Sequence, residues 1–296
     1  MEGAGSRRPF PCTIVVVKYV GRVIAALLTV VLALWVGAVG LLWSNEARLV
    51  YRASWTRSWS SSDGPFTELR FPSTDGLELE GMTLGRSEPA ERAYWILFFH
   101  GAGWSIHRRQ QRIQLEQLHD LGYNVFAAEY RGFGRNNGTP TEAGLYADAA
   151  SAYRHLTTSL GVRPDRVILA GRSLGSAVAV ELATHVHAAG LILLSPIDSV
   201  PDTGARLYPW APVRLLASNQ FDALSRIDRV HVPVLIVHAT NDRFVPLVVG
   251  RALYARATGL KAMLETAGGH NSAGFNPVSE LGDALAHFWP PAAAIE

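Results

Sequence analysis

The most conspicuous hydrophobic pattern in the chain is the run 23–43, whose 21 residues include no charged side chain. As an α-helix rising about 1.5 Å per residue, this run would be roughly 30 Å long, which matches the hydrocarbon core of a bilayer. It lacks the polar face of a core helix, and it is longer than the apolar region of about 7–15 residues in most signal peptides. The run therefore predicts a transmembrane anchor, with a cleaved signal peptide as the alternative.

Beyond residue 65 the pattern becomes that of β-strands. Residues 66–71 and 77–84 alternate polar and apolar positions on either side of the turn Ser-Thr-Asp-Gly, which predicts a half-exposed hairpin. From residue 93 onward, short runs are apolar throughout, as in parallel strands that helices cover on both faces. Runs of this kind occupy residues 93–99, 123–129, 166–171, 190–195 and 232–239.

Helical patterns separate these apolar runs. Residues 108–122 end on a glycine, and residues 141–161 repeat apolar side chains at helical spacing. This alternation predicts an α/β fold with a mostly parallel, doubly wound sheet and right-handed crossovers. The interval 198–231 is too short for a second domain, so we interpret it as a small helical lid. We divide the chain into a basic segment (1–22), the anchor (23–43), a linker (44–65) and a globular domain (66–296).

Composition narrows the possible classes of protein. Apolar residues make up 48% of the 296 positions and charged residues 18%, so a large core is expected and general disorder is not. The net charge of +2, from 27 basic and 25 acidic residues, gives no case for a nucleic-acid partner. The single cysteine, Cys12, excludes an internal disulfide framework and a multi-cysteine metal site.

The candidate nucleophile is Ser173, in the sequence Gly-Arg-Ser-Leu-Gly between an apolar strand and a helix. A nucleophile elbow needs this sharp strand-to-helix turn, because the turn lifts the serine hydroxyl clear of the sheet edge. Glycines at 171 and 175 relieve contacts that a Cβ atom would make there, and the positive end of the following helix favours developing negative charge. The alternative is a structural serine that only caps the helix.

A serine needs a base, and the base needs an orienting acid. In this architecture the acid and then the histidine follow the serine, each from a loop after a strand. Asp242 comes shortly after the apolar strand 232–239, and His270 lies in a glycine-rich loop after a further short strand. We therefore predict Asp242 as the acid and His270 as the base, with Asp198 as the rival acid.

A tetrahedral intermediate also needs amide donors for its oxyanion. The Leu174 N–H, directly after the nucleophile, is one expected donor. The second is expected from the loop His-Gly-Ala-Gly that follows residues 93–99, and we assign it to the Ala102 N–H, with Gly103 and Trp104 as alternatives. His100 is expected to hold the shape of this loop.

Other motifs fail on their spacing. A dinucleotide fingerprint Gly-x-Gly-x-x-Gly is broken at Asn137 in one loop and at Ile106 in another. No His-Glu-x-x-His motif occurs, and His185 and His187 would point in different directions on a helix. We therefore expect neither a cofactor nor a metal ion.

From about residue 66 to 290 the chain resembles the α/β-hydrolase superfamily, and more narrowly its membrane-anchored Bem46-like branch with the animal α/β-hydrolase-domain relatives. The resemblance is carried by HGAGWS, AEYRGFGRNNGTPTEAGLYADA, VILAGRSLGSAVA, LSPIDSV, YPWAPVRLLASNQFDALSRI, VPVLIVHATNDRFVP and AGGHN. It implies an α/β-hydrolase fold and a serine hydrolase of esters, thioesters or related acyl compounds, with Ser173, Asp242 and His270 matching the family triad. One departure is Ala239, where many relatives have glycine.

The leading expectation is thus a membrane-anchored serine hydrolase whose partners are a lipid-like acyl substrate and the bilayer. A peptidase of the same fold and a non-catalytic scaffold are the alternatives, and the oligomeric state stays open. Positive charge near a span favours the cytoplasmic side, so the basic residues predict a cytoplasmic N-terminus and a globular domain on the other side. The margin is four before the span (Arg7, Arg8, Lys18, Arg22) against three after it (Arg48, Arg52, Arg57).

Overall fold

A computed structural model describes residues 11–53, 56, 65–85 and 93–291, and the chain forms two compact units that divide between Asn45 and Glu46. Ten of the 22 residues of the predicted linker (54, 55 and 57–64) and the first ten residues of the predicted basic segment lie outside the described residues. The first unit contains the helix α1 (Pro11–Ser44). Within α1, Val15–Ser44 has a mean hydropathy of 2.5 and is long enough to be a candidate membrane span. The predicted anchor, 23–43, lies inside this helix.

The second unit is built on one eight-stranded sheet in the order β1-β2-β4-β3-β5-β6-β7-β8. The strands β1 and β2 are antiparallel to each other, and β2 is antiparallel to β4; every other neighbouring pair is parallel. The strands are β1 (Thr67–Pro72), β2 (Glu78–Leu84), β3 (Trp95–Phe99), β4 (Asn124–Ala128), β5 (Val167–Arg172), β6 (Gly190–Leu194), β7 (Val234–Ala239) and β8 (Lys261–Thr266). The predicted mostly parallel α/β sheet is confirmed.

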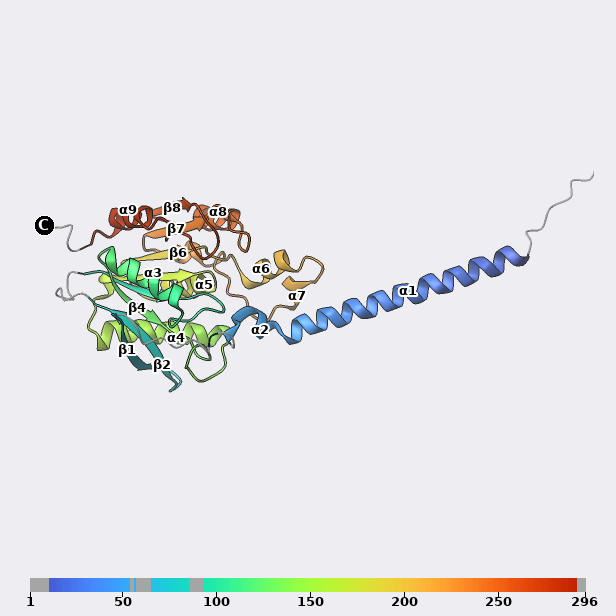
Figure 1. The fold of residues 1–296 in the computed structure, drawn as a ribbon, viewed down its shortest axis with the longest axis horizontal. Helices are drawn as coiled ribbons and strands as arrows, with labels where there is room; N and C mark the ends of the chain where they lie inside the picture. The colour runs from blue at the N-terminus through green and yellow to red at the C-terminus, as the bar shows by residue number, and fades with distance from the viewer. Residues whose placement is uncertain (1–10, 54–55, 57–64, 86–92, 292–296) are drawn as a thin grey trace, which may run out of the picture. The chain divides into compact units, whose positions relative to one another are not determined.

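Helices cover both faces of the sheet because alternate residues of its central strands point to opposite sides (Figure 1). One apolar core contains Leu97 and Phe99 of β3 with α4 (Glu142–Arg154), α5 (Leu174–Ala183) and α8 (Leu247–Arg256). The other contains Ile96 and Phe98 with α3 (Arg109–Asp120) and α9 (Ser279–Phe288). This two-sided burial explains why the central strands have no polar face.

Two local predictions differ from the structure. The helix expected over 141–161 is α only as far as Arg154, and one π-helical turn (His155–Ser159) follows it. The hairpin is half-exposed on β1 only, because β2 lies between β1 and β4 and is buried along most of its length. Glu80 stays buried on β2 because it pairs with Arg70 and Arg135.

The segment 198–231, interpreted as a lid, holds two α-helices after β6 and one 3₁₀ turn (Ile227–Arg229) before β7. The α-helices are α6 (Val200–Leu207) and α7 (Val213–Leu216), which pack against each other and stand out from the body of the second unit (Figure 1). A short helix at the start of this unit, α2 (Glu46–Tyr51), reaches the end of α7 through hydrogen bonds from Ser218 and Asn219 to Glu46.

Candidate active site

The chain turns from β5 into α5 at Ser173, which has the unusual dihedral angles φ 51° and ψ −118°. This backbone conformation is strained for a residue with a side chain, and such strain is concentrated at functional sites. The turn is possible only because its neighbours are small. A Cβ atom on Gly175 would lie 2.6 Å from the His100 carbonyl oxygen, and one on Gly171 would lie 2.7 Å from Ser176 Cα. The sequence therefore builds the sharp bend that was predicted.

His270 lies between the other two predicted side chains. Its Nε2 is 2.9 Å from Ser173 Oγ, and its Nδ1 is 2.6 Å from Asp242 Oδ2. The three residues come from the carboxyl ends of β5, β7 and β8, which meet at one edge of the sheet. The structure thus brings together residues that are up to 97 positions apart in the sequence.

The surroundings of Asp242 favour its ionised form. Burial alone would raise the pKa of this carboxyl, but the hydrogen bond to His270 outweighs it, together with backbone N–H donors, so the pKa is lowered. Phe244 and Val245 donate these backbone bonds to Oδ1 at 2.9 and 2.8 Å. Oδ2 is thereby left to His270. An ionised carboxylate in this place can hold the imidazole in one tautomer and stabilise it when it is charged.

Asp198, the rival acid, is engaged elsewhere. Its two carboxylate oxygens accept hydrogen bonds from the Arg206 guanidinium at 2.8 and 2.6 Å, and the Ser199 N–H adds a third at 2.8 Å. These contacts attach α6 to the end of β6. The structure does not bring Asp198 to His270, since the Nδ1 of that histidine faces Asp242.

The loop after β3 passes beside Ser173. A Cβ atom on Gly101 would lie 3.2 Å from Ser173 Cβ, so a larger residue would have to displace Ser173 by a few tenths of an ångström. The Gly103 N–H donates to the Tyr51 carbonyl at 2.8 Å, and the Trp104 N–H donates to the Gly101 carbonyl at 3.2 Å. Among the described residues, the Ala102 and Leu174 N–H groups have no protein acceptor. Two of the three candidate donors in this loop, the N–H groups of Gly103 and Trp104, are therefore already used in backbone hydrogen bonds. The third candidate donor is the Ala102 N–H.

A buried glutamate that sequence reasoning missed holds this loop at both ends. Glu129, directly after β4, lies 2.8 Å from His100 Nε2 through one carboxylate oxygen. Its other oxygen accepts from the Ser105 hydroxyl and, at 3.1 Å, from the Ile106 N–H. All of these groups are out of contact with water. The only signal in the sequence was an acidic residue at the end of an otherwise apolar strand.

A second missed contact joins the nucleophile strand to the histidine loop. The Arg172 guanidinium donates to Gln114 Oε1 at 2.5 Å, and Gln114 Nε2 donates to the Asn271 carbonyl at 2.8 Å. Arg172 is fully buried against Trp104 and Phe275, and this burial lowers its pKa to about 9. Gln114 on α3 therefore bridges the residue before Ser173 and the residue after His270.

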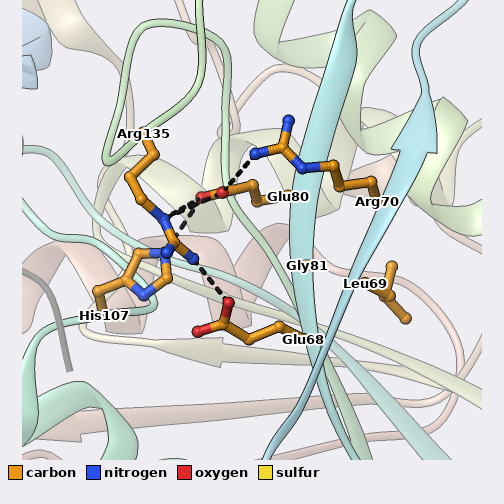
Figure 2. Close-up of a pocket in the computed structure, with 7 residues that line it drawn as sticks. All are labelled: Glu68, Leu69, Arg70, Glu80, Gly81, His107 and Arg135. Atoms are coloured by element: carbon orange, nitrogen blue, oxygen red, sulfur yellow. Dashed lines mark hydrogen bonds and ion pairs between the residues drawn. The ribbon is translucent and has the colours of Figure 1, made fainter. Parts of the chain in front are cut away.

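A separate cavity of about 250 Å³ opens beside β1 and β2, and none of the three predicted catalytic side chains lines it. Figure 2 shows that its charged side chains pair with one another: Glu80 contacts Arg70, His107 and Arg135, and Arg135 also contacts Glu68. Within the described part of the chain, no cluster of three or more His, Cys, Asp or Glu side chains could hold a metal ion. The ion pairs of Arg135 with Glu68 and Glu80 connect the loop after β4 to the hairpin.

Comparison with known proteins gives one family match and several relatives. Residues 90–219 match the family model described as serine aminopeptidase, S33. An uncharacterised protein of Mycobacterium tuberculosis is 37% identical over 243 residues, which cover 79% of this chain and 84% of the relative. The α/β hydrolase domain-containing protein 17C of Mus musculus is 31% identical over 221 residues, which cover 74% of this chain and 67% of that protein.

Solved structures share the fold at low sequence identity. An esterase of Pyrococcus furiosus superposes with a TM-score of 0.64 at 19% identity, over 79% of this chain and 96% of the esterase. An α/β hydrolase of Vibrio vulnificus gives a TM-score of 0.67 at 20% identity, over 81% and 91% of the two chains. The sheet order, the strained turn at Ser173 and the relatives that match most of the chain agree, and the protein belongs to the α/β-hydrolase superfamily.

Proposed function

We propose that this protein is a membrane-anchored serine hydrolase that cleaves ester or thioester bonds of acyl compounds. The observation that carries the proposal is the position of His270, which lies within hydrogen-bond distance of both Ser173 Oγ (2.9 Å) and Asp242 Oδ2 (2.6 Å). A nucleophile, a base and an orienting acid in this arrangement suit acyl transfer. The match to a serine hydrolase family over residues 90–219 supports the same reaction class.

The chemistry proceeds in two halves. In the first, His270 Nε2 accepts the proton of Ser173 Oγ as the oxygen attacks the substrate carbonyl carbon, and the carbonyl π electrons move onto its oxygen. The tetrahedral intermediate collapses, and the imidazolium gives its proton to the departing alcohol or thiol. In the second, water attacks the acyl-enzyme with His270 again as the base, and a carboxylic acid leaves. Asp242 accepts the Nδ1–H bond throughout.

We assign the oxyanion hole to the N–H groups of Leu174 and Ala102. The support is the bonding of their neighbours: Gly103 and Trp104 already donate to Tyr51 and Gly101. Donors that are fixed before the substrate arrives stabilise the developing negative charge without reorganisation. The Glu129 carboxylate keeps the loop in the conformation that leaves Ala102 available.

We propose that residues 23–43 within α1 anchor the protein as a single membrane span. The support is the length and mean hydropathy of Val15–Ser44. From the basic residues on each side of the span we propose a cytoplasmic N-terminus and a hydrolase domain on the other side. The test uses the variant Leu260→Cys in a chain that also carries Cys12→Ser, because Leu260 is strongly exposed. We expect a membrane-impermeant maleimide to label it in intact cells, and labelling only after the cells are lysed would contradict this orientation.

A peptidase is the second candidate, because the description of the matching family model names an aminopeptidase. An esterase forms the acyl-enzyme by cleaving an ester or thioester bond, whereas a peptidase forms it by cleaving an amide bond. An alcohol or thiol leaves more readily than an amine, so an amide is the harder bond to cleave, and a peptidase must in addition hold the peptide chain in place. Turnover of aminoacyl anilides faster than of acyl esters would favour the peptidase.

The test compares wild type with Ser173→Ala on a series of acyl esters and thioesters of increasing chain length. We expect the variant to lose at least about 10³-fold in kcat with its fold unchanged, because the attacking oxygen is removed. Labelling by a fluorophosphonate should disappear with it. Ser225→Ala, at an exposed serine of the same unit, is the matched control and should keep wild-type turnover. Equal turnover by Ser173→Ala would refute the proposal.

A further inference from the structure

The buried side chain of Arg172 lies between two of the loops that carry the proposed catalytic groups. Arg172 ends β5, directly before Ser173. Its guanidinium carbon lies 5.1 Å from the centre of the Trp104 ring and 5.3 Å from the centre of the Phe275 ring. Trp104 belongs to the loop after β3, and Phe275 follows His270 in the loop after β8. One buried cation is thus packed between the loop with the proposed oxyanion donor and the loop with the proposed base.

Arg172 is unusual because its hydrogen-bond partner carries no charge. Its Nη1 donates to the neutral Gln114, and its Nη2 has no hydrogen-bond partner among the described residues. Burial, and then the like charge of Arg108, lower the pKa of Arg172 to about 9, which still leaves the guanidinium charged at neutral pH. A buried charge without an opposite charge is costly, and groups of this kind are concentrated at functional sites.

The charge of Arg172 fixes the orientation of the Gln114 side-chain amide. A guanidinium can only donate hydrogen bonds, so the amide oxygen must face it. The amide nitrogen is then turned toward the loop after β8, where it donates to the Asn271 carbonyl at 2.8 Å. The opposite orientation would set two donors against each other at Arg172 and two acceptors against each other at Asn271. Arg172 and Gln114 therefore act as one unit, which we call the positioning pair.

The loop that carries His270 has few other attachments. Gly268 and Gly274, with φ angles of 102° and 77°, bound the part of the loop that contains this histidine. Glycine leaves the backbone free to adopt several conformations, so the loop does not fix its own shape. Apart from the two bonds of His270, only the Gln114 side chain ties the described residues between these glycines to another element by a hydrogen bond, at Asn271. The position of His270 therefore depends on Gln114.

The topology of the sheet makes this tie important. Ser173 follows β5 and His270 follows β8, and β6 and β7 lie between these strands. The distance between the two side chains therefore depends on the placement of several separate elements. Gln114 on α3 connects them by a shorter route, from the residue before Ser173 to the residue after His270.

We propose that Arg172 and Gln114 are positioning residues that hold His270 Nε2 at hydrogen-bond distance from Ser173 Oγ. The inference rests on the proposed hydrolase, and it assigns to the pair the geometry of the site and no proton transfer. General-base catalysis needs the two atoms within about 2.6–3.2 Å of each other, and a displacement of about 1 Å can cost about 10²-fold in rate. Loss of the pair therefore lowers kcat and changes KM little.

The experiment uses three variants of the full chain in detergent micelles. Gln114→Met keeps nearly the size of the side chain and removes both of its hydrogen bonds. Gln114→Glu keeps an acceptor for Arg172 but turns a second acceptor toward the Asn271 carbonyl. Gln111→Met is the matched control, because Gln111 is a buried glutamine of the same helix whose amide has no hydrogen-bond partner among the described residues.

We expect both substitutions of Gln114 to lower kcat on a short acyl ester by about 10- to 100-fold, with KM within about threefold of wild type. Gln111→Met should keep kcat within about threefold of wild type. Gln114→Glu should unfold at a temperature no lower than wild type, because it gives the buried Arg172 an opposite charge, so its loss of kcat would come from geometry. The downfield NMR signal of the His270 Nδ1–H reports the bond to Asp242 without turnover. It should broaden in both Gln114 variants and remain in Gln111→Met.

Wild-type kcat in Gln114→Met, an equal loss of kcat in Gln111→Met, or an unchanged His270 signal in both Gln114 variants would overturn the role of the positioning pair. If Gln114→Met does not fold, Gln114→Glu decides the question by the same kinetics and spectra. Failure of the proposed hydrolase is a different result, because wild type and Ser173→Ala would then hydrolyse the ester equally. The His270 signal would still report the positioning pair in that case.

Discussion

At the scale of single residues, the sequence offers two aspartates, Asp242 and Asp198, as partners of His270. Their hydrogen bonds in the structure differ. Asp242 offers one oxygen to His270 while backbone N–H groups hold the other. Asp198 is saturated by Arg206, Thr203 and its neighbour Ser199. In the structure the imidazole of His270 has Asp242 as its carboxylate partner, and Asp198 is bound to the guanidinium of Arg206 instead. Both aspartates follow a strand, so the sequence does not separate them, and the hydrogen bond to His270 supports Asp242 as the proposed acid.

The first prediction compares substitutions that remove one carboxylate charge at each position. Asp242→Asn should lower kcat by about 10³–10⁴, because the amide no longer fixes the imidazole tautomer or stabilises its charged form. Asp198→Asn should lower the Tm by weakening the attachment of α6, and it should keep kcat within about tenfold of wild type. Steady-state hydrolysis of one short acyl ester and thermal unfolding of both variants are the measurements. Similar losses of kcat in the two variants would contradict the assignment.

The lowered pKa of Asp242 gives a second prediction, on stability. A carboxyl whose pKa is lower in the folded than in the unfolded chain stabilises the fold above the unfolded value, about 3.9 for aspartate, and this contribution is lost as the pH falls through the folded pKa. The difference in unfolding free energy between wild type and Asp242→Asn should therefore be largest near neutral pH and should shrink as the pH falls. Urea unfolding at a series of pH values measures the difference. A difference that is unchanged by acidification would contradict this linkage.

At the scale of elements, the sequence predicts what local chemistry determines. Wholly apolar runs define the buried parallel strands, and two glycines around Ser173 define the sharp turn, because the crowding that they relieve involves atoms close in the chain or on the neighbouring strand. The rule that loops after parallel strands meet at one edge then predicts that side chains from several strand ends lie close together. The order of serine, acid and histidine along the chain is what the resemblance to the α/β-hydrolase superfamily implies.

Contacts between side chains that are distant in the sequence and buried in the fold could not be predicted from the sequence. Glu129 is one of 25 acidic residues, and nothing in its local sequence shows that it lies between His100 and Ser105. Alternation on β2 suggested an exposed Glu80, but the partners that bury it, Arg135 and His107, come from loops far along the chain. Side chains whose role depends on distant partners become visible only when the fold brings the partners together.

The loop after β3 carries the proposed oxyanion donor Ala102, and we call it the oxyanion loop. Its contact with the end of β4 gives a third prediction. Glu129→Ala should lower kcat by about 10- to 100-fold with a smaller change in KM, because the loop that positions the Ala102 N–H loses its support at both ends. Glu80→Ala is the matched control: it removes a buried, paired glutamate from the adjacent strand β2, and the Glu80 carbonyl accepts from the Glu129 N–H at 3.0 Å.

Both variants should lose stability, since each leaves buried donors without an acceptor. Only Glu129→Ala should show the additional loss of kcat when the two are compared below their unfolding temperatures. Kinetics on a short soluble ester, together with thermal unfolding, separates the two effects. If Glu80→Ala lowers kcat as much as Glu129→Ala does, the effect is general destabilisation and Glu129 has no positioning role.

At the scale of the whole molecule, the residues directly after the candidate span are part of the hydrolase unit. Tyr51 is buried, its ring packs edge-on against Phe221 at 6.1 Å, and its hydroxyl donates to Asn219. Its carbonyl accepts the Gly103 N–H of the oxyanion loop. Thr56, also buried, accepts from the Gly134 N–H at 2.8 Å. Although the sequence predicts a linker over 44–65, α2 contacts both the lid and the loop beside Ser173.

The last prediction concerns where the chain can be shortened. A chain that begins at Glu46 should be soluble, folded and active on short esters, because it loses the candidate span and keeps every contact of α2. A chain that begins at Phe66 also loses the buried Tyr51 side chain and the carboxylate that ties the lid, and by analogy with the removal of other buried aromatic side chains this should cost about 3–5 kcal/mol of unfolding free energy. It should in addition lose activity out of proportion to its folded fraction, because the Gly103 N–H no longer has its acceptor and the loop beside Ser173 is free to move.

Urea unfolding and ester hydrolysis of the two chains give the measurement. Equal stability and activity would mean that α2 only connects the membrane to the hydrolase, whereas the expected difference would make it the element through which the anchor, the lid and the oxyanion loop are held together.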